Sequence, residues 1–484
     1  AIAMAELLTP KIVIIGAGPT GLGAAVRLTE LGYKNWHLYE CNDTPGGLSR
    51  SFLDENGFTW DLGGHVIFSH YQYFDDVMDW AVQGWNVLQR ESWVWVRGRW
   101  VPYPFQNNIH RLPEQDRKRC LDELVRSHAR TYTEPPNNFE ESFTRQFGEG
   151  IADIFMRPYN FKVWAVPPCL MSTEWVEERV APVDLERIRR NIQENRDDLG
   201  WGPNATFRFP QRGGTGIIYQ AIKEKLPSEK LTFNSGFQAI AIDADAKTIT
   251  FSNGEVVSYD YLISTVPFDN LLRMTKGTGF KGYDEWPAIA DKMVYSSTNV
   301  IGIGVKGTPP PHLKTACWLY FPEDTSPFYR ATVFSNYSKY NVPEGHWSLM
   351  LEVSESKYKP VNHSTLIEDC IVGCLASNLL LPEDLLVSKW HYRIEKGYPT
   401  PFIGRNNLLE KAQPELMSRC IYSRGRFGAW RYEVGNQDHS FMQGVEAIDH
   451  VLGLATEETT VANPGRVNGT RATTHFGLLQ KDMV

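Results

Sequence analysis

The stretch KIVIIGAGPTGLGAAVRLTELGYKNWHLYE, from Lys11 to Glu40, decides the fold of this chain. It opens with a β-branched run, 12–15, that is typical of a buried parallel strand. Three glycines follow in the spacing G-x-G-x-x-G, namely Gly16, Gly18 and Gly21. The helix after such glycines directs its N-terminal N–H groups at a pyrophosphate, and an acid about twenty residues further on can bind a ribose hydroxyl. The stretch therefore predicts a dinucleotide-binding βαβ unit that ends at Glu40, for either NAD or FAD.

Two further glycine pairs bear on the choice of dinucleotide. Gly46-Gly47 lies shortly after the acid and favours FAD, because a loop there has to pass close to the flavin and its phosphates. Gly63-Gly64 directly precedes His65. A lone histidine is usually structural, but one in this position could also meet the isoalloxazine ring. Both interpretations of His65 stay open on the residues alone.

Composition narrows the class of protein. A length of 484 residues exceeds one hydrophobic core and predicts two or three domains. Lys plus Arg is 49 and Asp plus Glu is 57, and this net charge of −8 argues against nucleic-acid or membrane-surface binding. No apolar run approaches the roughly 20 residues that span a bilayer, and we see no secretion signal. The seven cysteines are scattered without a CxxC pair, so we expect reduced thiols, no metal site and a cytoplasmic location.

The rest of the chain changes periodicity several times. Charges alternate with apolar residues at helical spacing in 113–130, 138–148 and 184–198, which predicts a helical insertion. The aromatic and proline-rich run 156–168 inside it does not look like a plain helix. Residues 231–242 are expected to be a strand, and later apolar runs between 294 and 392 predict a mostly antiparallel sheet. The polar tail after residue 456 is expected to be loosely held.

Together these patterns predict an α/β fold with a discontinuous, Rossmann-like FAD-binding domain, a helical insertion domain and a mostly antiparallel β-sheet substrate domain. We expect the FAD-binding domain in 4–90, 210–293 and 405–455, the helical domain in 108–207, the sheet domain in 91–107 and 294–404, and a tail in 456–484.

Six motifs in order carry a resemblance to a known family. They are GGLSRS, DLGGH, YPFQNN, NFKVWAVPP, the segment 209–216 and RYEVGNQDHS. Together they resemble the eukaryotic type of UDP-galactopyranose mutase, from Met4 to about Leu454. The resemblance implies a flavin-dependent isomerase that interconverts UDP-galactopyranose and UDP-galactofuranose without net redox change. Reduced FAD N5 would act as the nucleophile on the anomeric carbon. It would also explain why no Ser-His-Asp or paired-carboxylate arrangement stands out in the sequence.

The resemblance implies a role for each of a set of residues. Expected FAD contacts are Gly16, Gly18, Gly21, Glu40, Gly47, Leu48, Ser49, Gly64, Gly425, Asn436, Gln437 and Ser440. His65 resembles the histidine whose loop moves next to the reduced flavin. Arg179 and Arg330 resemble the arginines that clamp the diphosphate, since a planar charged fork suits phosphate oxygens. Expected uridine contacts are Tyr103, Phe105, Gln106, Asn160 and Trp164. Tyr320, Tyr398 and Tyr432 resemble tyrosines that share the phosphate oxygens, and Asn204 resembles part of a closing flap.

Partners follow from the same resemblance. UDP and the two UDP-sugars are the expected ligands, and NADPH is the expected reductant of the flavin. Candidate NADPH contacts are Arg90, Ser92 and Arg426. We expect a monomer that binds neither nucleic acid nor a membrane.

Two other interpretations share part of the pattern. An amine-oxidase-like or desaturase-like oxidoreductase would have the same fingerprint but an apolar substrate tunnel. An escort protein for prenylated GTPases would share the fold without flavin, but this chain keeps all three glycines and the acid.

Overall fold

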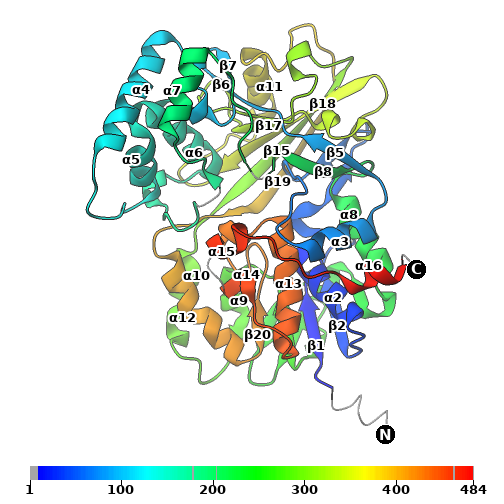
Figure 1. Ribbon diagram of the computed structural model, residues 1–484. Helices are drawn as coiled ribbons and strands as arrows, with labels where there is room; N and C mark the ends of the chain where they lie inside the picture. Colours follow the sequence, from blue (N-terminus) through cyan, green and yellow to red (C-terminus); the bar gives the residue numbers. More distant parts are fainter. Residues whose placement is uncertain (1–8, 177–178, 203, 462–463, 483–484) are drawn as a thin grey trace.

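The computed structural model describes residues 9–176, 179–202, 204–461 and 464–482. Residues 4–8 of the expected FAD-binding domain and parts of the expected tail lie outside the described residues. Two bodies lie one above the other in Figure 1, with a parallel sheet in the lower body and a largely antiparallel sheet in the upper one. The α/β fold class is therefore confirmed, and the division into domains stays a proposal.

A five-stranded parallel sheet forms the lower body and contains the predicted βαβ unit. Its order is β20 (Ile421–Ser423), β13 (Tyr261–Ser264), β1 (Ile12–Ile15), β2 (Trp36–Glu40) and β9 (Leu231–Phe233). The central strand β1 is buried along its whole length, because helices cover both faces of the sheet. Ile12 and Ile14 pack with one set of helices, α2 (Pro19–Glu30), α3 (Gln72–Ala81), α8 (Gly216–Lys225) and α13 (Gln437–Val451). Val13 and Ile15 pack with another, α9 (Phe268–Met274), α10 (Trp286–Lys292) and α12 (Arg405–Ser418).

Glycines bring α2 and α13 into close contact on one face of the parallel sheet. A Cβ at Gly23 would lie 2.2 Å from the Phe441 carbonyl oxygen, and one at Gly444 would lie 1.9 Å from the Thr20 carbonyl oxygen. Both contacts are with backbone, so neither helix could accept a side chain there without moving. This packing holds the N-termini of the two helices at the same end of the sheet (Figure 1).

The segment predicted as one strand, 231–242, divides between two sheets. β9 ends at Phe233, and β10 (Ala239–Asp243) begins after a 3-10 turn, Ser235–Phe237. Asn234 caps that turn by accepting the N–H of Gly236, an Asx motif that breaks a strand. β10 joins a four-stranded sheet with β12 (Val256–Ser258), β11 (Thr248–Phe251) and β14 (Thr275–Lys276).

The upper body contains a seven-stranded sheet. Its order is β19 (Leu386–Pro399), β15 (Tyr295–Lys306), β18 (His346–Glu355), β17 (Arg330–Thr332), β16 (Trp318–Tyr320), β6 (Ser92–Val96) and β7 (Arg99–Pro102). All pairings are antiparallel except that of β16 with β6. The predicted antiparallel character is thus confirmed, and β19 runs seven residues beyond its predicted end at 392. Helix α11 (Leu366–Ala376) packs on this sheet.

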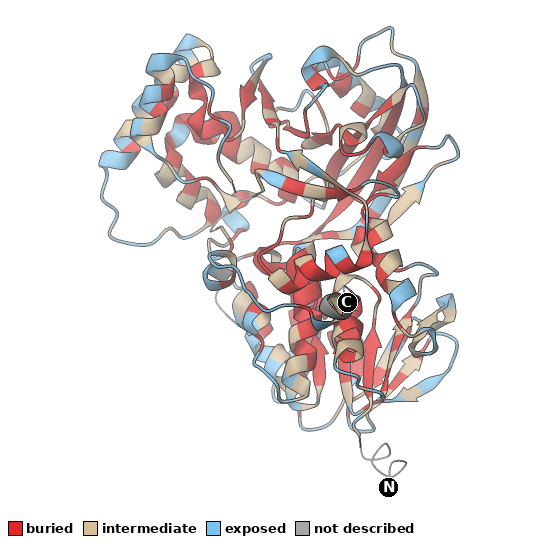
Figure 2. Ribbon diagram, turned by 45° about the vertical axis from the view of Figure 1, so that its right-hand side comes forward, coloured by how far each residue is buried: buried red, intermediate tan, exposed pale blue. Residues whose placement is uncertain are grey.

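The helical insertion lies beside the upper sheet and consists of α4 (Glu114–Ala129), α5 (Phe139–Ile151), α6 (Arg157–Trp164) and α7 (Leu185–Glu194). Figure 2 shows exposed residues on the outer faces of these helices and buried residues on the inner ones, as the alternation of charged and apolar residues predicts. The prediction that 156–168 is not a plain helix is wrong for its first part. Pro158 lies at the start of α6, directly after a π-helical turn, Ala152–Met156, and Ala165 ends the helix in a left-handed conformation.

Two small antiparallel sheets complete the fold, the hairpin of β3 (Ser51–Leu53) with β4 (Thr59–Asp61) and the pair of β5 (Trp85–Gln89) with β8 (Thr206–Pro210), whose strands are far apart in the sequence. The expectation of a loosely held tail is wrong for its described residues. Three short helices form there, α14 (Glu458–Val461), α15 (Pro464–Asn468) and α16 (Gly477–Asp482). Phe476 is fully buried against the α3 core, and Glu457 pairs with buried Arg424 at 2.7 Å. A few buried anchors therefore fix a segment that is polar on average.

Candidate active site

A cavity of about 620 Å³ lies between the two bodies. Its lower wall begins where four parallel strands end, because Gly16, Glu40, Thr265 and Gly425 each line it at or just after a strand's carboxyl end. The crevice at the carboxyl ends of the strands is the usual ligand site of such sheets. The volume is also in the usual range for ligand pockets, roughly 300–1,000 Å³.

The three glycines of the fingerprint meet different packing constraints. Gly16 has φ +104°, and a Cβ there would lie 1.8 Å from Thr265 Oγ1. A Cβ at Gly21 would lie 1.7 Å from the Gly16 carbonyl oxygen, so this glycine allows helix and strand to pack. Gly18 differs, because the nearest atom to a Cβ would be Gly47 Cα at 3.7 Å. Gly18 and Gly47 are in contact, since a Cβ on Gly47 would lie 3.2 Å from Gly18 Cα. Both line the cavity, where the missing side chains let a pyrophosphate approach the backbone.

Glu40 lines the cavity and also holds the glycine loop. Its Oε1 accepts the N–H of Ala17 at 2.8 Å, and its Oε2 accepts the N–H of Asn42 at 2.9 Å. An acid fixed in this way at the end of β2 is placed to meet a ribose hydroxyl.

The N-terminus of α13 forms a third part of the lower wall. Asn436, Gln437 and Ser440 all line the cavity, and their contact with FAD stays a prediction. Tyr219 Oη donates to Gln437 Oε1 at 2.6 Å, and the N–H of Gly425 donates to Gln443 Oε1 at 2.7 Å. Free N–H groups at a helix N-terminus favour an anion or an electron-rich ring oxygen. These observations on the lower wall fit FAD.

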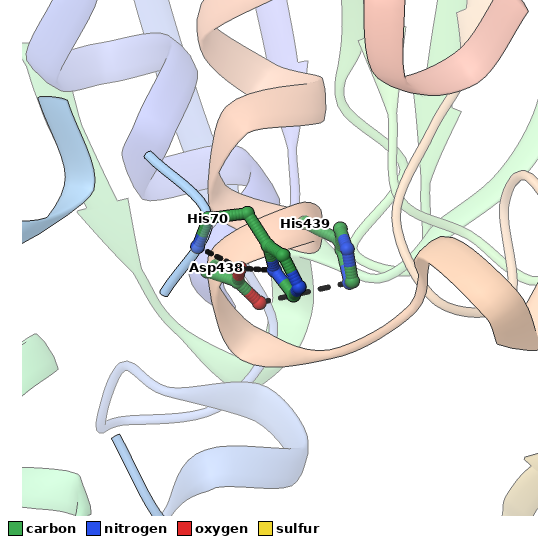
Figure 3. A group of neighbouring side chains, drawn as sticks. All are labelled: His70, Asp438 and His439. Carbon is green, nitrogen blue, oxygen red and sulfur yellow. Dashed lines mark hydrogen bonds and ion pairs between the residues drawn. The ribbon is translucent and has the colours of Figure 1, made fainter. Parts of the chain in front are cut away.

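A buried group of His70, Asp438 and His439 backs this helix N-terminus (Figure 3). Asp438 Oδ2 lies 2.8 Å from His70 Nδ1 and accepts the His70 backbone N–H at 3.1 Å. The two imidazole rings stack with centroids 5.0 Å apart, and His439 Nε2 lies 2.7 Å from Asn468 Oδ1. Burial raises the pKa of Asp438, but the two histidines and the hydrogen bonds of His70 more than offset it and lower that pKa to about 2. The ligand types would suit a metal ion, yet His70 and Asp438 already bond each other. The absence of a metal stays a prediction.

The upper wall carries positive charge. Arg179, Arg330 and Arg426 all line the cavity. Arg179 Nη2 donates to the carbonyl oxygens of Tyr432 and Glu433 at 3.2 and 2.9 Å, and its buried Nε has no partner among the described residues. Burial lowers the pKa of Arg426, which donates only to carbonyl oxygens, those of Gly397 and Gly435. In the part of the chain that the structure describes, neither Arg179 nor Arg426 pairs with a carboxylate. Such uncompensated cations favour an anionic ligand.

Aromatic side chains complete the upper wall, with Tyr103, Tyr320, Tyr398 and Tyr432 all lining the cavity. Tyr103 and Tyr320 stack with ring centroids 5.0 Å apart. Burial raises the pKa of both phenols and also that of Tyr398. These hydroxyls therefore stay protonated at neutral pH and can donate hydrogen bonds to phosphate oxygens.

His65 lies at the junction of the two walls, on the loop after Gly63-Gly64. Its Nδ1 is buried without a partner among the described residues. Burial lowers the pKa of His65 to about 4, an effect that Arg426 and Arg330 reinforce and Glu352 opposes. The imidazole is therefore neutral at physiological pH.

Several predicted site residues do not line the cavity, namely Gly21, Phe105, Gln106, Asn160, Trp164, Arg90 and Ser92. Phe105 stacks on Phe155 inside the helical insertion, and Asn160 donates to the Met156 carbonyl oxygen. Trp164 lies behind the site, with ring centroids 4.7 Å from Tyr432 and 5.5 Å from Tyr398. Direct contact of these residues with a ligand stays a prediction.

Others of this set hold loops in place. Gln106 Nε2 donates to the Ala181 carbonyl oxygen at 3.0 Å and so supports the segment that carries Arg179. Arg90 donates to Asn204 Oδ1 at 2.9 Å and to the Trp201 carbonyl oxygen. It therefore ties down the loop in which Asn204 lines the cavity. Ser92 is buried on β6, and its Oγ has no partner among the described residues.

The lining residues that the sequence prediction missed include Trp201, Thr298, Glu352 and Lys396. Glu352 could have been found, because a single acid interrupts the apolar run Leu349–Val353. A buried charge in a strand is rare unless it has a partner or a function. Lys396 pairs with Asp269 at 2.6 Å, and no local pattern connects these two residues.

A flavoprotein with a binding site for an anionic substrate is the class that this fold and cavity define. Comparisons with known proteins agree. The family of flavin-containing amine oxidoreductases matches residues 19–447. A crystal structure of reduced UDP-galactopyranose mutase is 99% identical, covers 97% of this chain and 100% of that one, and has a TM-score of 0.95. An oxidoreductase from Methanosarcina mazei shares the fold alone, with 15% identity, coverage of 91% and 100%, and a TM-score of 0.63.

Two curated relatives match over short segments of the chain. Hydroxysqualene dehydroxylase from Sinorhizobium fredii is 47% identical over 66 residues, which are 13% of this chain and 16% of the relative. The zeta-carotene-forming phytoene desaturase from Myxococcus xanthus is 42% identical over 57 residues, or 12% of this chain and 11% of the relative.

The chain belongs to the flavin-containing amine oxidoreductase family and, within it, to the UDP-galactopyranose mutases. Within the described residues, no helix is both long and apolar enough to cross a membrane.

Proposed function

We infer that this protein interconverts UDP-galactopyranose and UDP-galactofuranose, with FAD in the lower wall and the UDP-sugar against the upper wall. The observation that carries this inference is the uncompensated charge of Arg179 and Arg426 beside a flavin-type cradle. An oxidase or desaturase of apolar substrates would need an apolar tunnel, and three cavity-lining arginines do not suit one. When bound and reduced, the flavin supplies the nucleophile for the anomeric carbon.

The protein's own residues would bind, orient and stabilise charge. Arg179 and Arg330 would hold the diphosphate and stabilise the negative charge that develops as it separates from the sugar. Tyr320, Tyr398 and Tyr432 would donate hydrogen bonds to the same oxygens. His65 would be a neutral group next to the ring system, because burial keeps its pKa near 4. It could donate or accept a hydrogen bond without adding charge to the site.

The loop that carries Asn204 would close over the substrate. Arg90 holds it through Asn204 and Trp201 in this structure. Tyr103 lies beneath it, with the Arg90 guanidinium carbon 5.3 Å from the ring centroid. Opening of the loop would release Arg90 from these partners and expose the ring for uracil.

We further propose that NADPH reduces the flavin from the same cavity. Arg426 lines the cavity, whereas Arg90 would reach a ligand only after the loop opens. Arg90→Ala should slow reduction by NADPH but not reduction by dithionite. Equal rates of NADPH reduction in the two proteins, measured by the loss of flavin absorbance, would count against this role.

Location and assembly also remain proposals. We propose a cytoplasmic monomer, of the eukaryotic type, that binds neither nucleic acid nor membrane. Cell fractionation tests the location, and sedimentation equilibrium of the holoenzyme tests the monomeric state.

The test of the activity uses the purified holoenzyme with UDP-galactofuranose. After reduction by dithionite, we expect conversion to UDP-galactopyranose, resolved by liquid chromatography. The oxidised holoenzyme is the control and should be inactive. Absence of the pyranose product from the reduced protein would refute the proposed function.

A further inference from the structure

One carboxylate in the upper wall has no role in the proposed function so far. Glu352 lies on β18, near the middle of the seven-stranded sheet, and is 2% exposed. Its partners in register are Val300 on β15 and Arg330 on β17. The side chain lines the cavity, so this acid stands between the sheet and the ligand site.

Glu352 fixes the orientation of Arg330. The guanidinium donates to Glu352 through Nε and, at 2.7 Å, through Nη2. Tyr329 Oη donates to Glu352 Oε1 at 3.4 Å. Burial raises the pKa of Glu352, but the charge and hydrogen bonds of Arg330 outweigh it, so the carboxyl stays ionised. Among the described residues Arg330 Nη1 has no partner, which leaves that nitrogen for a ligand in the cavity.

The same carboxylate contacts the loop that carries His65. The backbone of Gly64 faces it and helps to lower the pKa of Glu352. Gly63 has φ +122°, and a Cβ there would lie 2.9 Å from Glu352 Oε1. A Cβ at Gly64 would lie 3.4 Å from Arg330 Cζ. The loop therefore packs directly on the ion pair, and the backbone conformation of Gly63 requires glycine there.

We propose that Glu352 is a positioning residue that holds Arg330 and the 63–65 loop in one arrangement, so that diphosphate binding and the position of the loop are linked. This inference rests on the proposed function, because it takes UDP as the ligand of Arg330.

Diphosphate binding and the position of the loop are linked because Arg330 and the loop both contact the same buried carboxylate. Movement of the loop away from β18 removes the Gly64 backbone, which stabilises the ionised form of this buried carboxyl, and is therefore costly. Rotation of Arg330 away from Glu352 separates a buried ion pair, which is also costly. A diphosphate on Arg330 Nη1 would favour the paired arrangement and with it the docked loop. Two sites that share a two-state element in this way affect each other reciprocally.

Binding affinity provides the first test. Glu352→Gln keeps the shape of the side chain but removes its charge, and we expect UDP to bind the holoenzyme about tenfold or more weakly, by analogy with other buried charge partners. Glu355→Gln is the matched control, because Glu355 pairs with Arg393 at 2.9 Å on the same strand but outside the cavity. The control should bind UDP with nearly unchanged affinity.

A double-mutant cycle keeps the test valid if the single variant is unstable. Arg330→Gln combined with Glu352→Gln leaves no unpaired charge in the sheet. If Glu352 acts through Arg330, the double variant should bind UDP about as weakly as Arg330→Gln alone. Additive losses of affinity would overturn the proposal.

Hydrogen exchange provides the readout that a merely structural role would not change. In the unaltered holoenzyme, saturating UDP should slow amide exchange in the segment 62–68. In Glu352→Gln, also saturated with UDP, that protection should be lost. Equal protection in the two proteins would overturn this inference alone. If the unaltered holoenzyme did not bind UDP, the proposed function would fail and this inference with it.

Discussion

The two walls of the cavity are built in different ways. Backbone forms most of the lower wall, where Gly16, Gly18 and Gly47 present main-chain groups and helix N-termini. Side chains form the upper wall, where arginines and tyrosines arrive from the helical insertion, the sheet and the segment before α13. Shape and close approach therefore set the ligand of the lower wall, whereas charge and hydrogen-bond donors set that of the upper wall.

This difference explains how one family can serve several chemistries. A cradle made of backbone depends on few residues and tolerates change elsewhere, so the fold persists at 15% identity in the Methanosarcina oxidoreductase. A wall made of side chains can be replaced piece by piece. The comparison predicts that changes in the lower wall act on folding and on flavin content, and changes in the upper wall on substrate.

The largest effect is expected at Gly21. Gly21→Ala would place a methyl group 1.7 Å from the Gly16 carbonyl oxygen, so α2 and β1 would have to separate. We expect loss of bound flavin and of most folded protein, measured by flavin absorbance per chain and circular dichroism. Gly18→Ala is the contrasting variant, since its methyl group meets no chain atom within 3.7 Å. It should fold but hold less flavin. Normal flavin content in both variants would contradict the assignment of flavin binding to the lower wall.

Trp164 tests whether the upper wall depends on packing behind it. Its indole is 2% exposed and contacts Tyr398 and Tyr432 from behind. Trp164→Ala should lower the free energy of unfolding by about 3–5 kcal/mol, as deletion of a large buried ring does. UDP affinity should fall as well, while Trp164→Phe keeps most of both. An unchanged midpoint in urea unfolding would contradict this role.

Arg179 tests the upper wall directly. Arg179→Ala should weaken UDP binding by about 2–4 kcal/mol, as truncation of a buried charge partner does. Flavin content should not change, because among the described residues the Arg179 side chain donates only to the carbonyl oxygens of Tyr432 and Glu433. Arg393→Ala, outside the cavity, is the control for isothermal titration with UDP. Loss of flavin in Arg179→Ala would contradict the prediction that the upper wall binds substrate and not flavin.

The smallest effect concerns Asp61, a fully buried acid behind the lower wall. Burial raises its pKa to about 6, against hydrogen bonds from Ser51 and Thr215 that lower it. The folded state thus binds this proton more tightly than the unfolded state, so stability falls as pH rises from about 4 to about 6. In Asp61→Asn the fall in the free energy of unfolding over this pH range should be smaller by about 1–3 kcal/mol, measured by urea unfolding at several pH values.

Asp54→Asn provides a contrast of opposite sign. Burial raises the pKa of Asp54, but hydrogen bonds from Ser388, Trp60 and the backbone outweigh it and lower that pKa. Its contribution to stability is present at neutral pH and is lost as the pH falls below the ordinary range of a carboxyl group. The same pH slope in both variants would contradict these assignments.

The lower wall could be predicted from the sequence because its parts are local. Strand, glycines, helix and Glu40 lie within thirty consecutive residues, Lys11 to Glu40, and their spacing has a direct physical reason. The cavity receives Gly16, Gly18 and Glu40 where that spacing indicates. The fold class followed from the same local periodicities.

Local spacing does not predict the upper wall, because distant segments assemble it. Its arginines and tyrosines were expected only from the family resemblance, and they line the cavity. Trp164 and Asn160 belong to α6, which lies one layer behind the surface of the cavity, and spacing alone does not distinguish the two layers. Glu352 and Arg330 meet only through the register of β17 and β18. The tail was mispredicted for a related reason, since single anchors such as Phe476 fix it despite its polar composition.

The most direct test of the account asks whether the flavin works without net redox change. The holoenzyme is reduced under anaerobic conditions, freed of excess reductant and mixed with excess UDP-galactofuranose, while product and flavin absorbance are followed together. We predict many molecules of UDP-galactopyranose per flavin while the flavin stays reduced. One product molecule or fewer per flavin, formed as the flavin becomes oxidised, would contradict the account and indicate an oxidoreductase.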